Sequence, residues 1–139
     1  MKSEQGGVTL VELLIVVVIV AILAAIAFPT YQDQLRKGSR AAAQAEMVKI
    51  ANREAQYLLD ARNYAVGAGA LTTLSIALPN EVSAHYAVTI VNASGGVTVS
   101  TPPSFTIKAT PLTGGRQVPD GELTLTHEGA KTRAGNPGW

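Results

Sequence analysis

The stretch that decides the fold is "VTLVELLIVVVIVAILAAIAF", residues 8–28, in which only Thr9 and Glu12 are polar. As an α-helix, this stretch would rise about 31 Å at ~1.5 Å per residue, which matches the roughly 30 Å hydrocarbon core of a bilayer. No polar side chain follows Glu12 before the stretch ends at Phe28. A helix on the surface of a small globular domain would show a polar face, so this segment is predicted to enter a membrane.

The apolar segment has two possible fates. It could be the apolar core of a secretory signal with Lys2 before it and an A-x-A site at residues 25–27, so that cleavage near Ala27 would release a periplasmic binding domain. Alternatively, cleavage after Gly7 would keep the whole segment as a working helix. Glu12 favours the second fate, because an acid in a membrane segment costs ~2.5–3.5 kcal/mol on insertion scales and is usually functional.

The arrangement of four residues in and around the segment carries a family resemblance. "GGVTLVELLIVVVIVAILAAIAFPTY", residues 6–31, has Gly7 before a new N-terminal residue, Val8, then Glu12, and Pro29 after the apolar run. This pattern resembles the class III signal of type IV pilins, whose relatives include the pseudopilins of type II secretion. The resemblance implies an α+β type IV pilin fold, in which the outer half of a long N-terminal helix packs on a small antiparallel sheet.

The resemblance also implies roles for these residues. A prepilin peptidase would cut between Gly7 and Val8 and N-methylate Val8, and Pro29 would kink the helix. Glu12 would pair with the new amine of a neighbouring subunit during filament assembly. Two unit charges ~4 Å apart attract by about 4 kcal/mol at an effective dielectric of 20, before the cost of desolvation.

Three features depart from the pattern of pilins. Val8 stands where Phe is usual, and Ala21 stands where many pilins have a helix-loosening Gly. The leader carries Lys2 and Glu4, whereas basic residues follow the apolar run, so positive-inside counting favours the opposite membrane orientation. These basic residues are Arg36, Lys37 and Arg40.

Beyond the apolar run, helical spacing of apolar residues continues to about residue 62, and residues 66–83 are predicted to form a long loop with a short helical piece near 71–78. Alternating patterns then predict an antiparallel sheet. The predicted organisation is a leader at 1–7, an N-terminal helix at 8–62 and a globular head at 63–139. The strand patterns are "HYAVTIV" (85–91), "VTVS" (97–100), "FTIKAT" (105–110) and "ELTLT" (122–126).

The C-terminal sequence "DGELTLTHEGAKT", residues 120–132, resembles the last strand and turn of many pilins, in which cysteines form a disulfide. This chain has no cysteine, and Asp120 and Gly138 occupy the corresponding places. The loop at residues 128–139 is therefore expected either to be mobile or to be held by packing, with Trp139 docked on the sheet.

Catalytic and metal-binding chemistry have little support in the sequence. There is no P-loop, G-x-S-x-G or H-E-x-x-H motif, so we expect neither an enzyme nor a cofactor. Two histidines and three acids could form a metal site, but no D-x-D-x-D spacing is present and we expect none. The residues considered are His85, His127, Asp120, Glu122 and Glu128.

The net charge of +1 favours no particular partner, so nucleic-acid binding would need a local basic patch. A basic tip on the head could bind DNA, as in some competence pilins, although scattered solvated charges are the simpler interpretation. The tyrosines are expected to fill the helix–sheet interface and subunit contacts. The basic candidates are Lys108, Arg116, Lys131 and Arg133, and the tyrosines are Tyr31, Tyr57, Tyr64 and Tyr86.

Taken together, these features predict a structural subunit of a type IV pilus, with a minor subunit favoured over a major one. Its partners would be other pilin subunits, the prepilin peptidase and the assembly machinery of the inner membrane. It would sit in the inner membrane through residues 8–28 and later join an extracellular filament. A type II secretion pseudopilin is the alternative within the same family.

Overall fold

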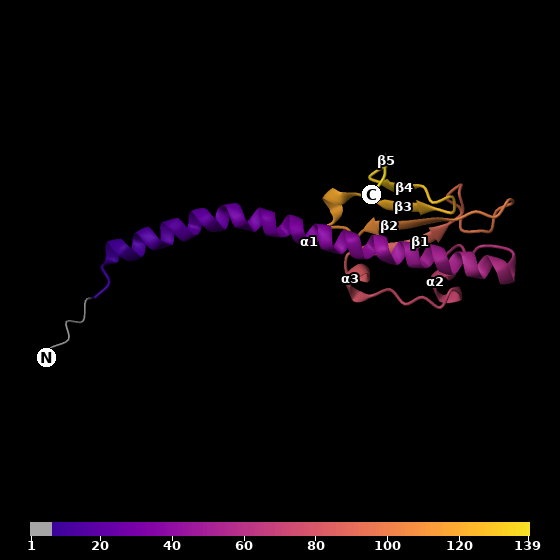
Figure 1. The fold of residues 1–139 in the computed structure, drawn as a ribbon, viewed down its shortest axis with the longest axis horizontal. Coiled ribbons are helices and arrows are strands. Elements are labelled where there is room, and N and C mark those ends of the chain that lie inside the picture. The colour runs from indigo at the N-terminus through magenta and orange to yellow at the C-terminus, as the bar shows by residue number, and fades with distance from the viewer. Residues whose placement is uncertain (1–6) are drawn as a thin grey trace. The chain divides into compact units, whose positions relative to one another are not determined.

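The computed structural model describes residues 7–139, so the predicted leader lies outside the described residues except for Gly7. One long helix, α1 (Leu10–Ala61), precedes two short helices and a sheet, in the order shown in Figure 1. The chain divides into two compact units between Leu35 and Arg36, so the outer part of α1 belongs to the head. The predicted α+β arrangement is confirmed.

Helix α1 begins and ends within two residues of the predicted bounds, 8–62. At its start, Thr9 Oγ1 accepts a hydrogen bond from the backbone N–H of Glu12 at 3.2 Å, which satisfies one of the free donors of the first turn. At its end, Arg62 has a φ of 56°, the left-handed conformation that commonly ends helices. Pro29 lies inside the continuous helix.

The sheet is a meander of neighbouring antiparallel strands in the order β1-β2-β3-β4-β5. Buried residues alternate with more exposed ones along β1, β2 and β3, because one face of the sheet packs towards α1 and the other faces outward. The strands are β1 (Tyr86–Val91), β2 (Thr106–Pro111), β3 (Leu123–Thr126), β4 (Lys131–Arg133) and β5 (Asn136–Pro137).

The core lies between the inner face of the sheet and the outer half of α1. Met47 and Ile50 of α1 are fully buried, as are Ile107 and Leu123 of the sheet. Each buried aliphatic side chain of this size contributes about 1.5–3 kcal/mol relative to exposure, so this interface supplies the cohesion of a chain without disulfides. Tyr86 is buried here as expected.

The connections differ from the sequence prediction in two places. The helical piece predicted near 71–78 is helix α2 (Ala70–Thr73), and a second helix, α3 (Asn80–Ser83), follows it. The predicted strand at residues 97–100 is wrong, because the segment belongs to a loop. In that loop the Asn92 side chain donates to the carbonyl of Thr98 and accepts from the N–H of Gly96, which folds the backbone away from strand geometry.

The C-terminal segment is held by packing rather than by a disulfide. The indole Nε1 of Trp139 donates to the backbone carbonyl of Thr124 at 3.0 Å, and Lys131 Nζ lies 4.5 Å from the Trp139 ring centroid. The predicted docking of Trp139 on the sheet is therefore confirmed. Gly121 allows the close approach of Ala134, since a Cβ at position 121 would lie 2.5 Å from the Cβ of Ala134.

Candidate functional site on the helix and the head

The first turn of α1 places Glu12 in an exposed, apolar surrounding. Val8 precedes the helix and is 68% exposed, and the large apolar side chains from Leu10 to Phe28 are all about half exposed or more. Within residues 7–139, α1 is the one helix long and apolar enough to cross a membrane. An exposed surface of this kind is costly in water, so its partners lie outside the chain.

Glu12 also has a local role that the sequence analysis missed. Thr9 and Glu12 form the T-x-x-E pattern of a capping box, and the structure shows the bond from the Glu12 N–H to Thr9. An acid in the first turn also interacts favourably with the helix dipole. Within the described residues, the Glu12 carboxylate has no ion-pair partner.

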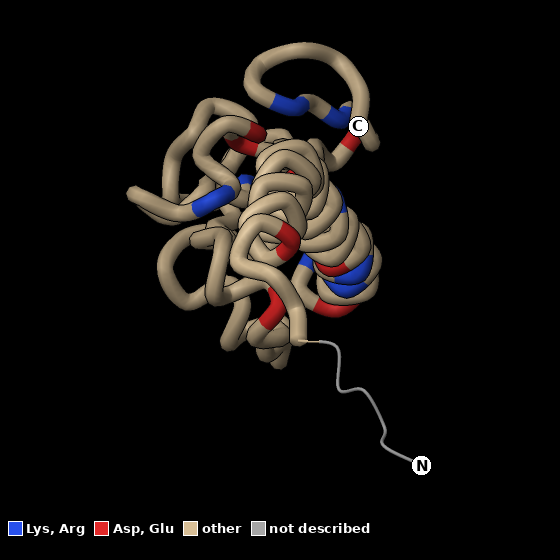
Figure 2. Tube along the Cα trace, turned by 90° about the vertical axis from the view of Figure 1, so that its left-hand side faces the viewer, with Lys and Arg blue, Asp and Glu red and all other residues tan. Residues whose placement is uncertain are grey.

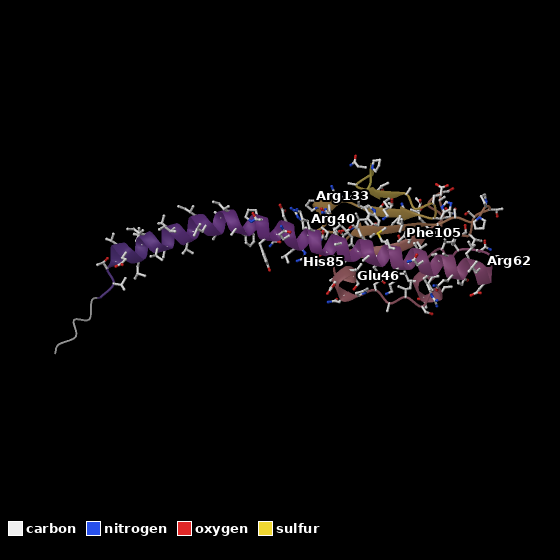
Figure 3. The ribbon with its side chains drawn as sticks, in the orientation of Figure 1. Arg40, Glu46, Arg62, His85, Phe105 and Arg133 are labelled. Atoms are coloured by element: carbon white, nitrogen blue, oxygen red, sulfur yellow. The ribbon has the colours of Figure 1, made fainter. Side chains whose placement is uncertain are left out.

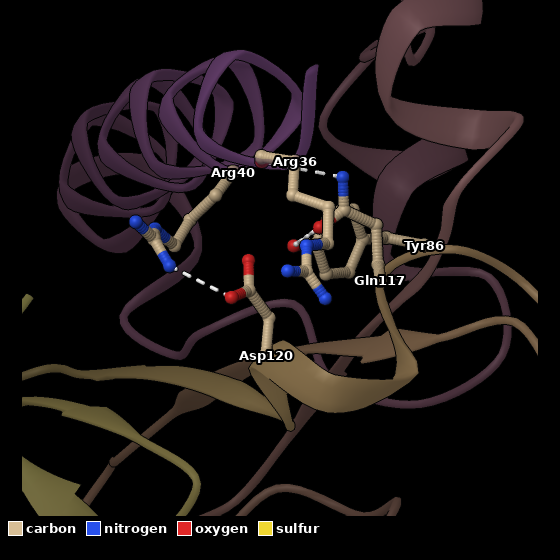
Figure 4. Close-up of polar contacts among 5 residues, drawn as sticks. All are labelled: Arg36, Arg40, Tyr86, Gln117 and Asp120. Carbon is tan, nitrogen blue, oxygen red and sulfur yellow. Dashed lines mark hydrogen bonds and ion pairs between the residues drawn. The ribbon is translucent and has the colours of Figure 1, made fainter. Parts of the chain in front are cut away.

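A polar clamp ties the β2–β3 loop to the start of the outer half of α1 (Figure 4). Asp120 Oδ1 accepts from Arg40 Nη1 at 2.8 Å. The fully buried Gln117 donates to the backbone carbonyl of Arg36 at 3.3 Å and accepts from the Tyr86 hydroxyl at 3.3 Å. Burial and the nearby Asp120 charge raise the pKa of Tyr86 to about 12, so Tyr86 remains a neutral donor.

The clamp uses a residue that the family resemblance had singled out for another reason. Asp120 stands where many pilins have a cysteine, and here it makes an ion pair whose side chains are 14% and 19% exposed. A disulfide would hold the loop to another loop, whereas this pair holds the loop to α1. Hydrogen bonds to charged groups are worth about 1.5–3 kcal/mol, which is enough for the clamp to fasten this loop.

A buried acid, Glu54, is the second polar feature that the sequence analysis missed. It is fully buried on the same helical stripe as Met47 and Ile50, and its Oε2 accepts from the backbone N–H of Ala65 at 2.9 Å. Burial raises the pKa of Glu54 to about 7, and the Ala65 bond opposes that rise. Its spacing of four residues from Ile50 is the signal that could have revealed it.

The candidate metal ligands are engaged in separate contacts. His85 Nε2 lies 2.8 Å from Arg116 Nη2, and His127 packs beside Phe105 with ring centroids 6.2 Å apart. Glu122 accepts from Thr110. Among residues 7–139, no group of three or more His, Asp or Glu side chains gathers in a way that could hold a metal ion.

The predicted basic tip does not form as one patch. Lys108 lies on the outer face of the sheet, and its Nζ is 3.8 Å from Glu122. Lys131 and Arg133 lie on β4, where they pair with Leu125 and Leu123 of β3. Arg116 instead bonds Ser39 and contacts His85. Figure 2 shows the basic residues dispersed over the head, and Figure 3 labels Arg133 and His85 among its side chains. The structure therefore leaves β4 as the place where two exposed cations are neighbours.

Comparison with known proteins identifies the family. Residues 29–124 match the family described as type IV minor pilin ComP, DNA uptake sequence receptor. Residues 2–28 match the prokaryotic N-terminal methylation motif. The first match covers most of the head, and the second covers the apolar segment with Gly7, Val8 and Glu12.

Curated relatives agree with these matches. The chain is 38% identical over 100 residues to a fimbrial protein of Neisseria meningitidis, covering 70% of this chain and 56% of that protein. It is 42% identical over 62 residues to the type IV major fimbrial protein FimA of Dichelobacter nodosus, covering 45% of this chain and 40% of the relative. The chain thus spans about half the length of these relatives.

A solved structure supports the fold. The high-resolution structure of a type IV pilin from Shewanella oneidensis superposes with a TM-score of 0.50 and 23% identity, over 75% of this chain and 98% of the other. The predicted fold and the predicted family are both confirmed. The chain belongs to the type IV minor pilin ComP family, and it has the type IV pilin fold.

Proposed function

We propose that this chain is a minor pilin that is cut between Gly7 and Val8 by a prepilin peptidase and N-methylated at Val8. It then waits in the inner membrane through residues 8–28 and joins a filament through α1, with the assembly machinery and other pilin subunits as partners. The observation that carries the proposal is Glu12, an acid on an exposed apolar helix that has no counter-charge among the described residues of its own chain.

The amine created by cleavage would supply that counter-charge. An ammonium and a carboxylate are each costly in an apolar surrounding, and each offsets part of the other's cost when they are paired. In a filament of packed α1 helices, the amine of Val8 on one subunit can meet Glu12 on its neighbour. The pair would set the axial register, while the apolar side chains supply the cohesion.

Assembly assays on two substitutions would test this role. Glu12→Gln keeps the size and the N-capping bond of residue 12 but removes its charge, so we expect a cleaved, membrane-stable subunit that is lost from sheared filaments. Thr9→Ala is the matched control, because it removes the cap and leaves the charge, and it should assemble normally. Intact mass should show methylated Val8 as the mature N-terminus in both variants. Normal incorporation of Glu12→Gln would overturn the charge-pairing role.

DNA binding is a second candidate function for the head. The family description names a DNA uptake sequence receptor, and residues 36–139 carry ten Lys or Arg against seven Asp or Glu. Lys131 and Arg133 are both exposed on β4, the strand beside the sheet edge, where they can approach phosphates. The Lys108 side chain faces Glu122 and is less suited to this role.

A DNA-binding measurement with the full chain in detergent would test the second candidate. Lys131→Gln combined with Arg133→Gln should weaken binding and lower the slope of log affinity against log salt by about 2, since each lost phosphate contact contributes ~0.9. Lys108→Gln is the control and should change the slope little. An unchanged slope in the double variant would remove β4 from the proposal.

The comparisons favour this reading over the alternatives. The matched relatives are fimbrial proteins rather than secretion pseudopilins, and the N-terminal methylation motif argues for retention of the apolar segment rather than release near Ala27. Loss of pili without a secretion defect in cells that lack the protein would separate the pilus from type II secretion.

A further inference from the structure

The β2–β3 loop, residues 112–122, exposes apolar and basic side chains together. Leu112 is 39% exposed and Val118 is 51% exposed, and the exposed Arg116 lies between them in the sequence. A loop that needed only to be soluble would not require apolar side chains on its surface. Apolar side chains beside cations are the composition of surfaces that rest on membranes.

The same loop is fastened to the first residues of the head. Gln117 donates to the carbonyl of Arg36 at 3.3 Å, Arg116 donates to Ser39 Oγ at 3.0 Å, and Asp120 pairs with Arg40 at 2.8 Å. These contacts fix the loop beside the segment of α1 at which the head begins (Figure 4).

That segment follows closely on the membrane-compatible run. Arg36 lies eight positions after Phe28 in α1, a helical rise of about 12 Å at ~1.5 Å per residue. The polar interface of a bilayer lies just outside its hydrocarbon core, within reach of long basic side chains on such a path. Lys37 and Arg116 are thus exposed cations at the end of the head from which the chain continues into the apolar segment.

We propose that this surface, defined here as the membrane-facing surface and formed by Lys37, Leu112, Arg116 and Val118, rests on anionic phospholipid headgroups before assembly. The cations bind lipid phosphates, and Leu112 and Val118 enter the interface. The Asp120–Arg40 pair positions the loop without adding net charge. This inference rests on the membrane anchoring of the proposed function, and it gives the basic residues after the apolar run a role that positive-inside counting does not.

The absence of cysteines makes a direct test possible in the full chain. A single Thr113→Cys carries a fluorophore on the β2–β3 loop, and Ser94→Cys carries it on the β1–β2 loop as the control site. The labelled protein is reconstituted in vesicles of phosphatidylcholine alone or mixed with phosphatidylglycerol, with a quencher attached to a fraction of the lipid headgroups. We expect quenching at position 113 to rise about twofold or more with phosphatidylglycerol, to fall at high salt, and to exceed that at position 94.

Two variants separate the contribution of the charges to membrane contact from that of the apolar side chains. Lys37→Gln with Arg116→Gln should abolish the dependence on phosphatidylglycerol, and Val118→Ser should lower quenching in both kinds of vesicle. Lys131→Gln with Arg133→Gln removes the same charge from β4 and should have no effect. Thermal unfolding followed by Trp139 fluorescence establishes that each variant retains its folded head.

The possible failures can be told apart. If the protein does not float with the vesicles, the membrane anchoring of the proposed function is wrong, and the inference falls with it. If it floats but quenching at position 113 is equal in the two kinds of vesicle, only the inference is overturned. Quenching changes that follow the protein-to-lipid ratio instead of the lipid charge would indicate contact between copies, and would also overturn it.

Discussion

The two halves of α1 are one continuous helix with opposite relations to their surroundings. From Leu10 to Phe28 the large apolar side chains are exposed, whereas beyond Arg36 the stripe that contains Met47 and Ile50 is fully buried by the sheet. The first half keeps its apolar surface for partners outside the chain, and the second half uses its own to hold the head. Both halves are therefore helical, and they differ in whether the surface that covers their apolar side chains belongs to the same chain.

Each half also holds an acid among apolar residues. Glu12 is exposed and has no counter-charge within the described residues of its own chain, whereas Glu54 is buried and bonded to the backbone of Ala65. Under the proposed function the first carboxylate pairs with an amine, whereas burial favours the neutral form of the second. Under the proposed function, the same residue type serves assembly in one half and folding in the other.

The largest expected effect comes from truncating matched apolar residues in the two halves. Ile50→Ala should destabilise the head by about 2–5 kcal/mol, because it leaves a cavity in the core. Ile19→Ala, at a side chain that is 52% exposed, should leave head stability nearly unchanged but weaken filament cohesion. Denaturant unfolding in detergent, followed by Trp139 fluorescence, measures the first effect. Equal destabilisation by both variants would contradict the division of roles.

The next effect concerns the pH dependence of head stability. The pKa of Glu54 is raised from 4.5 to about 7, so its contribution is fully present below pH 4.5 and is lost as the pH rises through about 7. The loss is on the order of 3 kcal/mol, since one pKa unit corresponds to ~1.4 kcal/mol. Glu54→Gln cannot ionise and keeps an acceptor for Ala65, so it should flatten this slope in pH-dependent unfolding. If the unfolding free energy of the variant still depends on pH in the same way, other groups cause that dependence.

A smaller effect is expected from the clamp. Asp120→Asn removes the charge opposite Arg40 in a largely buried site and should cost about 1–3 kcal/mol. Glu122→Gln is the matched control, because its pair with Lys108 is more than a third exposed and should be worth less than ~1 kcal/mol. Thermal unfolding of both variants tests the order. Equal effects would mean that the Arg40 pair does not fasten the loop.

The smallest effect belongs to the loop that was predicted as a strand. Val99 is 58% exposed, so Val99→Thr should change the unfolding free energy by less than ~0.5 kcal/mol. Asn92→Ala should cost more, because its side chain bonds the backbone of Ser94, Gly96 and Thr98. A large effect of Val99→Thr would indicate that this loop pairs as a strand in the folded head.

Local pattern predicted the elements whose partners are close in sequence or outside the chain. The helix bounds followed from periodicity and lay within two residues of those observed, and three strands followed from alternation. The pattern failed at residues 97–100, because Val97 and Val99 alternate as in a strand while the side chain of Asn92 closes a loop around them. Alternation reports the spacing of apolar residues, and it does not report whether a neighbouring strand is available.

By itself, the sequence determined that residues 8–28 form an apolar helix with one acid near its start, since hydrophobicity and helical rise depend on the chain alone. It also determined the pilin resemblance that the comparisons confirmed. Only the tertiary structure decided which charges meet: Arg40 with Asp120, 80 residues apart, and Glu54 with the backbone of Ala65. Such pairs depend on how the sheet folds back onto α1, and no local pattern encodes contacts over that distance.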